Sequence, residues 1–150
     1  MWVCTKENWA RKAFRAGKCE SQSSSAWMKA LMRTKSLTKC TECNTKVDYV
    51  YHFREPPPFI VLSLAKDLTV NMERAMTAGG YDYKLKGLLY HGDHHFSSRV
   101  IDEAGGIWFH DGIHTKRTCD YEGCIYAIDL KNLMRARHGR RCILGIYTIS

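Results

Sequence analysis

Two residues of complementary chemistry, His95 and Asp111, stand at the two ends of a segment that the sequence predicts to be a β-hairpin. The turn of this hairpin is residues 102–106, a polar and glycine-rich stretch between two apolar runs. A hairpin brings the start of its first strand beside the end of its second strand, so we expect the imidazole and the carboxylate to face each other. The alternative is that both are ordinary polar residues at the ends of surface strands.

An imidazole paired with a carboxylate is suited to activating a cysteine nucleophile. A cysteine attacks a carbonyl carbon as the thiolate, yet a free thiol has a pKa of about 8.5, so a neighbouring histidine must accept its proton. A carboxylate bound to the other ring nitrogen fixes the tautomer and stabilises the imidazolium that forms. His95 as the base and Asp111 as its orienting partner are therefore candidate catalytic residues.

Three sequence blocks, in this order, resemble the C-terminal half of the catalytic domain of the ubiquitin-specific proteases, a family of cysteine deubiquitinases. The first is residues 55–64, a strand led by three prolines, and the last is residues 141–147, an apolar closing strand. Between them, residues 83–111 hold a strand that ends at a His-x-x-x-His stretch and a second strand that contains a tryptophan. The region of the sequence covered by the resemblance is residues 37–147, which includes the segment before the first block.

The resemblance assigns roles to individual residues. It implies that His95 is the general base and Asp111 its orienting acid, and that His91, Gly92 and Phe96 contact the substrate. Two departures lie beside these positions: a histidine stands where the family has a glycine before the base, and the loop between residues 92 and 95 is shorter than the family's substrate-covering loop.

The fold class expected from the resemblance and the strand pattern is α+β with a mainly antiparallel sheet. It corresponds to the strand-rich, C-terminal part of a papain-like cysteine protease domain, with a helical arm at the N-terminus. We expect two regions, a basic helical arm over residues 1–36 and the protease-like part over residues 37–150.

Hydrophobic patterning predicts the individual elements. Two amphipathic helices are expected at residues 7–16 and 25–34, and a later helix at residues 130–139 with Asp129 as its N-cap. Strands are expected at residues 47–53, 59–64, 83–90, 96–101, 107–109 and 142–148. Residues 69–77 fit either a short strand or a helix.

The nucleophile of the resembled family has no counterpart in this sequence. That family carries its cysteine far upstream of the histidine, in an Asn-x-Cys-Tyr box at the start of a helix. Cys4 and Cys19 have neither such a box nor a preceding amide. We therefore expect a fragment that is inactive as this chain and that needs a separate chain or segment to supply the cysteine.

A Cys-x-x-Cys pair, Cys40 and Cys43, has the spacing of a zinc knuckle. A closed zinc site needs two further ligands, and Cys119 and Cys124 could contribute only if the fold brings them near. The protease chemistry requires no cofactor, so a structural zinc at Cys40 and Cys43 is the single cofactor that the sequence suggests.

Composition and charge limit the protein class. The chain has 150 residues, 45% hydrophobic and 25% charged, which is typical of a single globular domain. No window approaches the roughly 20 apolar residues of a membrane span, and the N-terminus lacks the apolar region of a secretory signal. These features favour a cytoplasmic or nuclear protein without membrane association, in which seven cysteines remain reduced.

Three functional hypotheses follow from these patterns. The leading one is a relative of the ubiquitin-specific proteases that hydrolyses the bond after the C-terminal glycine of ubiquitin or a similar modifier. The second is a ubiquitin-binding module without catalysis, because the thiol box is absent. The third is a basic protein that binds nucleic acid or zinc, because most of the formal net charge of +8 lies in the N-terminal arm; a solvated helix face explains that charge as well, so nucleic acid is the less favoured partner.

Overall fold

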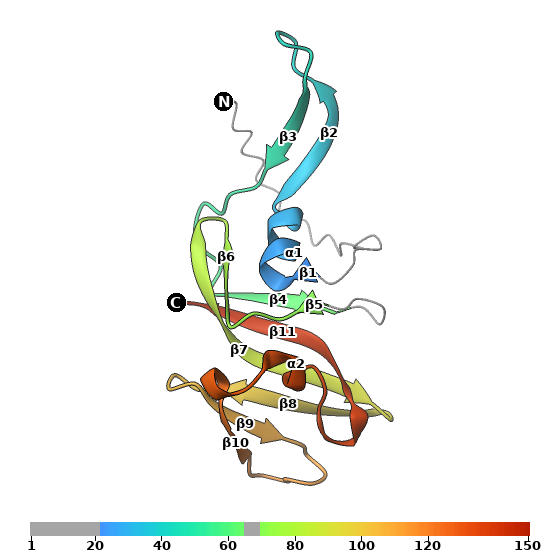
Figure 1. The fold of residues 1–150 in the computed structure, drawn as a ribbon, viewed down its shortest axis with the longest axis vertical. Helices are drawn as coiled ribbons and strands as arrows, with labels where there is room; N and C mark the ends of the chain where they lie inside the picture. The colour runs from blue at the N-terminus through green and yellow to red at the C-terminus, as the bar shows by residue number, and fades with distance from the viewer. Residues whose placement is uncertain (1–21, 65–69) are drawn as a thin grey trace.

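A seven-stranded antiparallel sheet forms the body of the protein in a computed structural model that describes residues 22–64 and 70–150 (Figure 1). Six strands follow the spatial order β10-β9-β8-β7-β11-β4, and β6 pairs with the free part of β7. The strands are β4 (Phe59–Ser63), β6 (Ala75–Ala78), β7 (Tyr81–Gly92), β8 (His95–Ile101), β9 (Gly106–His110), β10 (Asp120–Cys124) and β11 (Arg141–Ile149). The expected antiparallel, strand-rich architecture is present.

Two smaller strand pairs lie outside this sheet. A hairpin of β2 (Arg33–Lys39) and β3 (Lys46–Val50) projects from one end of the molecule (Figure 1). The strands β1 (Gln22–Ser23) and β5 (Val70–Asn71) form a short parallel pair. Residues 69–77, ambiguous in the sequence, therefore contribute the short strands β5 and β6 rather than a helix.

The helical arm expected over residues 1–36 is not what the described part of the chain shows. The first predicted helix, residues 7–16, lies outside the described residues. The second, predicted over residues 25–34, is α1 (Ser24–Leu31), and the chain then enters β2 at Arg33. The helix ends early because Arg33 and Thr34 pair with β3, which outweighs their helical spacing.

A polar cluster fixes α1 to the sheet. Ser23 caps the helix by accepting a hydrogen bond from the Ala26 amide, and Ser24 is completely buried. The Tyr147 hydroxyl on β11 donates to the Glu73 carbonyl at 2.8 Å and lies 3.0 Å from the Ser24 hydroxyl. Trp27 of α1 then packs into the same core as the buried face of the sheet.

The predicted helix over residues 130–139 is reduced to one turn, α2 (Leu130–Leu133). Asp129 caps it as predicted, accepting a hydrogen bond from the Lys131 amide at 3.0 Å. The helix stops because the Met134 carbonyl accepts from the Cys142 amide on β11, which draws the chain toward the sheet. The turns η1 (Ile125–Ala127) and η2 (Arg137–Gly139) flank α2, so this segment covers the inner face of the sheet (Figure 1).

Side-chain alternation along the strands separates a buried inner face from an exposed outer face. On β7, Tyr83, Leu85, Leu88 and Tyr90 point into the core. The predicted strands at residues 59–64, 83–90, 96–101, 107–109 and 142–148 match β4, β7, β8, β9 and β11 closely, whereas residues 47–53 are strand only as far as Val50. The edge strand β10 was not predicted, because Glu122 and Gly123 have low strand propensity and a bulge interrupts its pairing.

None of the helices in the described part of the chain has the length and apolar character needed to cross a membrane.

Replacing Tyr147 with phenylalanine should lower the free energy of unfolding by about 1–2 kcal/mol, because buried Ser24 and the Glu73 carbonyl lose their shared partner. Urea denaturation measures the change. Tyr126→Phe is the matched control. This side chain is 67% exposed, so removing its hydroxyl should leave the free energy of unfolding nearly unchanged. Equal effects of the two substitutions would contradict the role given to Tyr147.

Candidate active site

The structure brings His95 and Asp111 into direct contact. His95 is the first residue of β8 and Asp111 directly follows β9, and the two strands pair antiparallel with Ser98 opposite His110. The Nε2 atom of His95 lies 2.7 Å from Oδ1 of Asp111. The Asp111 side chain is fully buried, whereas the His95 side chain is 22% exposed. The imidazole therefore has one nitrogen fixed by a carboxylate and one edge open to solvent.

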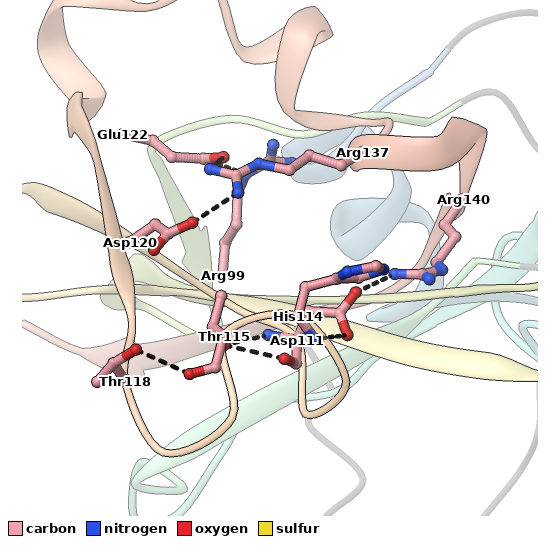
Figure 2. Close-up of polar contacts among 9 residues, drawn as sticks. All are labelled: Arg99, Asp111, His114, Thr115, Thr118, Asp120, Glu122, Arg137 and Arg140. Carbon is pink, nitrogen blue, oxygen red and sulfur yellow. Dashed lines mark hydrogen bonds and ion pairs between the residues drawn. The ribbon is translucent and has the colours of Figure 1, made fainter.

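A tight turn after β9 holds the Asp111 carboxylate in place. Its Oδ1 atom also accepts hydrogen bonds from the backbone amides of Ile113, at 3.0 Å, and His114, at 3.4 Å. Thr115 closes the turn, because its hydroxyl donates to the Asp111 carbonyl at 2.9 Å and its amide donates to the same carbonyl at 2.8 Å (Figure 2). Such a turn, built by an aspartate on the amides that follow it, fixes the direction of the carboxylate.

Arg140 occupies the second oxygen of the carboxylate. Its Nη1 atom donates to Oδ2 of Asp111, and both side chains are buried (Figure 2). Burial alone raises the pKa of Asp111, but the hydrogen bonds from Arg140, His95 and the two turn amides outweigh it and hold that pKa well below its usual range. The carboxylate is therefore ionised whenever the imidazole can act as a base.

A network of arginines places the segment that carries Arg140. Arg99 on β8 donates to Glu122 at 2.5 Å and to the Arg135 carbonyl at 3.0 Å. Arg137 pairs with Asp120 at 2.6 Å, and its guanidinium lies 4.6 Å from the ring centroid of Phe109. Figure 2 shows Arg99, Arg137 and their acidic partners Asp120 and Glu122 together with Arg140. The network fastens the segment that precedes β11 to the inner face of the sheet, and the side chain of Arg140, at the end of this segment, reaches Asp111.

Arg140 was missed by the sequence analysis. It directly precedes Arg141, which is exposed, and nothing in the local pattern distinguishes the two. The glycine at position 92 is related to the position of Arg140. A Cβ atom on Gly92 would lie only 3.2 Å from Cγ and 3.3 Å from Cα of Arg140. Gly92 is thus needed for the close approach of Arg140, a role that differs from the substrate contact expected for it.

The other expected substrate residues form an exposed edge beside the imidazole. His91 and Phe96 pair across β7 and β8, and their rings lie 4.5 Å apart. Asp93 and His94 connect the strands with positive φ angles of 50° and 58°, the backbone of a two-residue hairpin turn. This edge lies beside the candidate base, while a role for His91, Gly92 or Phe96 in substrate binding stays a prediction.

An open hollow of about 350 Å³ lies beside His95. It is lined by Leu89, His94, His95, Phe96, Ser97, Ser98, His110 and Gly112. Nε2 of His95 is engaged by Asp111, so Nδ1 is the nitrogen available to a reacting group. None of the described residues that line the hollow is a cysteine.

The described cysteines do not supply a nucleophile at this site. Burial raises the pKa of Cys142 to about 12, and its thiol donates to the Leu144 carbonyl, so Cys142 is a protonated core residue. Cys119 and Cys124 flank and end β10, and neither lines the hollow beside His95. Residues 4 and 19 lie outside the described part of the chain.

Cys40 and Cys43 lie in the turn of the β2–β3 hairpin. The Cys40 amide donates to the Thr45 carbonyl at 2.8 Å, and the Cys43 thiol lies 2.8 Å from the Thr45 hydroxyl, a contact that lowers the pKa of Cys43. Among the described residues, no group of three or more potential ligands is gathered in one place. The pair lies in a tight turn between the two strands, and zinc binding there stays a prediction.

Comparison with known proteins supports the fold. No protein-family model matches the sequence, and no curated protein matches it. Among solved structures, the chain is similar to a chain of the SAGA Ubp8/Sgf11/Sus1/Sgf73 DUB module bound to ubiquitin aldehyde, with a TM-score of 0.51 and 12% identity over 87% of this chain and 36% of that chain. It is equally similar, with a TM-score of 0.51 and 12% identity over 87% of this chain and 35% of that chain, to the module with a substituted Ubp8 bound to monoubiquitin.

The chain spans about a third of the length of the structures that it matches. At this level of identity the likeness concerns the fold alone, and it indicates a distant fold like that of a ubiquitin-specific protease module. Fold and site together define an antiparallel, strand-rich domain with a histidine and an aspartate paired at the β8–β9 hairpin.

Replacing Arg140 with methionine should lower the free energy of unfolding by about 3–5 kcal/mol at neutral pH, because the buried Asp111 carboxylate loses its cationic partner. Arg141→Met is the matched control: it removes the neighbouring arginine, which is exposed and forms no ion pair with the described residues, and it should cost under about 0.5 kcal/mol. Urea denaturation of both variants tests this difference, and similar losses would show that Asp111 does not depend on Arg140.

Proposed function

We propose that this chain carries the base and the orienting acid of a thiol-dependent site resembling that of a deubiquitinase, and that it does not hydrolyse substrate by itself. The observation that carries the proposal is the 2.7 Å contact between Nε2 of His95 and the buried Asp111 carboxylate. The absence of a cysteine among the described residues lining the adjacent hollow supports the second half of the proposal.

The proposed reaction needs a cysteine from a separate chain or segment. Nδ1 of His95 accepts the thiol proton, and the thiolate attacks the carbonyl carbon of the C-terminal glycine of the modifier. Asp111 stabilises the resulting imidazolium, which then gives its proton to the leaving amine and leaves a thioester. A water molecule, deprotonated by the same imidazole, attacks the thioester, and the thiol is released in its protonated form.

The proposed partner is ubiquitin or a related modifier, and no cofactor is required by this chemistry. The neighbouring structures are ubiquitin complexes of a multi-subunit module, which supports this class of partner at a coarse level. The proposed location is the cytoplasm or the nucleus, because the described cysteines are free thiols and suit a reducing compartment.

A thiol introduced into the hollow tests whether His95 acts as a base. Gly112 lines the hollow, and a Cβ atom at this position meets nothing within 4 Å, so Gly112→Cys should fold normally. At neutral pH iodoacetamide should alkylate the introduced thiol about tenfold faster than in the double variant Gly112→Cys/His95→Gln. This is the effect expected if His95 lowers the pKa of that thiol by about one unit. Peptide mass spectrometry measures both rates.

The exposed native Cys119 is the internal reference in the same digest, and its alkylation rate should be identical in the two proteins. Equal rates for the introduced thiol with and without His95 would refute the assignment of this histidine as a base.

A ubiquitin-binding module without catalysis is the second candidate, favoured by the lack of a cysteine in the hollow. Both candidates predict saturable binding of labelled ubiquitin and no turnover of a fluorogenic substrate attached to the ubiquitin C-terminus. Phe96→Ala should weaken binding about tenfold, because a 54% exposed aromatic ring at the site edge is removed. Phe59→Ala, which removes a 58% exposed ring from the far edge strand, is the control and should leave binding unchanged.

Turnover that disappears on His95→Ala and on one cysteine-to-alanine change would contradict the proposed inactivity of the isolated chain. Failure to bind ubiquitin at any concentration would remove the modifier from the proposal, while leaving the alkylation test of His95 intact.

A further inference from the structure

The outer face of the central sheet carries a continuous apolar row. The strand register places six residues directly side by side, each paired with the next. In spatial order they are Tyr121 on β10, Trp108 on β9, Val100 on β8, Gly87 on β7, Ile146 on β11 and Val61 on β4. With neighbouring strands about 4.8 Å apart, this row extends over about 24 Å.

Four of the six residues of the row are exposed to solvent, and Gly87 is buried. Tyr121 is 59%, Val100 52%, Val61 46% and Trp108 38% exposed, and Ile146 is half-buried. An antiparallel sheet with one face in water normally places polar residues on that face. A contiguous exposed apolar patch of this kind marks a surface that another protein covers.

The aromatic end of the row is rigid before any partner binds. Nε1 of Trp108 donates to Oδ2 of Asp102 at 2.7 Å, which holds the indole against the sheet. The rings of Trp108 and Tyr121 lie 5.1 Å apart at an interplanar angle of 57°. Aromatic side chains that are already ordered lose little conformational entropy on binding, so they are effective anchors of an interface.

In a symmetric pair of copies, the large side chains of one row can face the small residues of the other. Consider two copies stacked face to face about a two-fold axis that runs along the strands, between β7 and β8. Val100 of each copy then faces Gly87 of the other copy, the position of the row that has no side chain. In the same arrangement, Trp108 lies over Ile146 and Tyr121 lies over Val61, so each large side chain meets a smaller one.

The charges beside the row are complementary under the same symmetry. Lys84 and Asp102 occupy the next outward positions on β7 and β8, on the same side of the row. The two-fold axis therefore places Lys84 of one copy opposite Asp102 of the other, twice per pair. Lys84 forms no ion pair with the described residues of its own chain, so it is available for this contact.

We propose that the apolar row from Tyr121 to Val61 is the interface of a symmetric dimer, in which two copies of this chain stack the outer faces of their central sheets. Face-to-face packing of two antiparallel sheets about 10 Å apart is a common way to bury such faces. The proposal rests on the register and exposure of the row and not on the contact of His95 with Asp111. Leu89, Ser98 and His110, which line the hollow, lie next to the row on the same face of the sheet, so the dimer would also restrict access to the hollow.

Sedimentation velocity of the full chain, across a micromolar concentration series, tests the dimer. The unmodified protein should show a concentration-dependent dimer. Val100→Asp should raise the dimer dissociation constant about 100-fold or more, because it buries an unpaired carboxylate opposite Gly87. Lys84→Glu should raise it about tenfold by opposing Asp102 with a like charge.

Tyr126→Asp is the matched control, since this side chain is 67% exposed but lies outside the row, and it should leave the dissociation constant unchanged. Circular dichroism checks that each variant is folded, and Val61→Asp, at the other end of the row, replaces Val100→Asp if that protein unfolds. A monomer at every concentration, or a dimer that survives the substitutions at both positions, would overturn the proposal and leave the face to a different partner.

Discussion

The buried carboxylate of Asp111 is the constraint on which the site depends. A fully buried charge is stable only when it is paired and hydrogen-bonded. Here one oxygen is bound by Arg140, and the other is shared between His95 and the amides of the turn that follows. The direction of the imidazole is thus set by an ion pair behind it, and the orientation of a surface histidine depends on a buried arginine from the last strand.

Several other parts of the fold serve to bring Arg140 to the buried Asp111 carboxylate. Residues 125–140 lie across the inner face of the sheet and bring Arg140 to Asp111. This segment is fastened there by Arg99, which donates to the Arg135 carbonyl, and by Arg137, which pairs with Asp120 on β10. The inner face therefore carries the polar network and the core. The outer face carries the exposed apolar row and, next to it, Leu89, Ser98 and His110, which line the hollow beside His95.

The chemistry of the site is incomplete within the described residues. The carboxylate orients the imidazole to accept a proton. The described residues that line the hollow beside it carry hydroxyl and imidazole groups but no thiol. Cys142, the cysteine on the strand that follows Arg140, is unsuitable because burial keeps its thiol protonated. The proposed reaction therefore requires a nucleophile from outside the described part of the chain, and the open side of His95 is where it would have to approach.

The sequence by itself determined what depends on local geometry. The alternating strands, the turn at residues 102–106 and the cap at Asp129 follow from neighbouring residue types, and His95 and Asp111 are only 16 positions apart in one hairpin. Tertiary structure decided the ion pair of Arg140 with Asp111, the early end of α1, the single turn of α2 and the strand β10. Each of these depends on pairing or packing with a segment that is distant in the sequence. The free energy of that contact outweighs local conformational preference, and the contact does not appear as a periodic pattern of residue types.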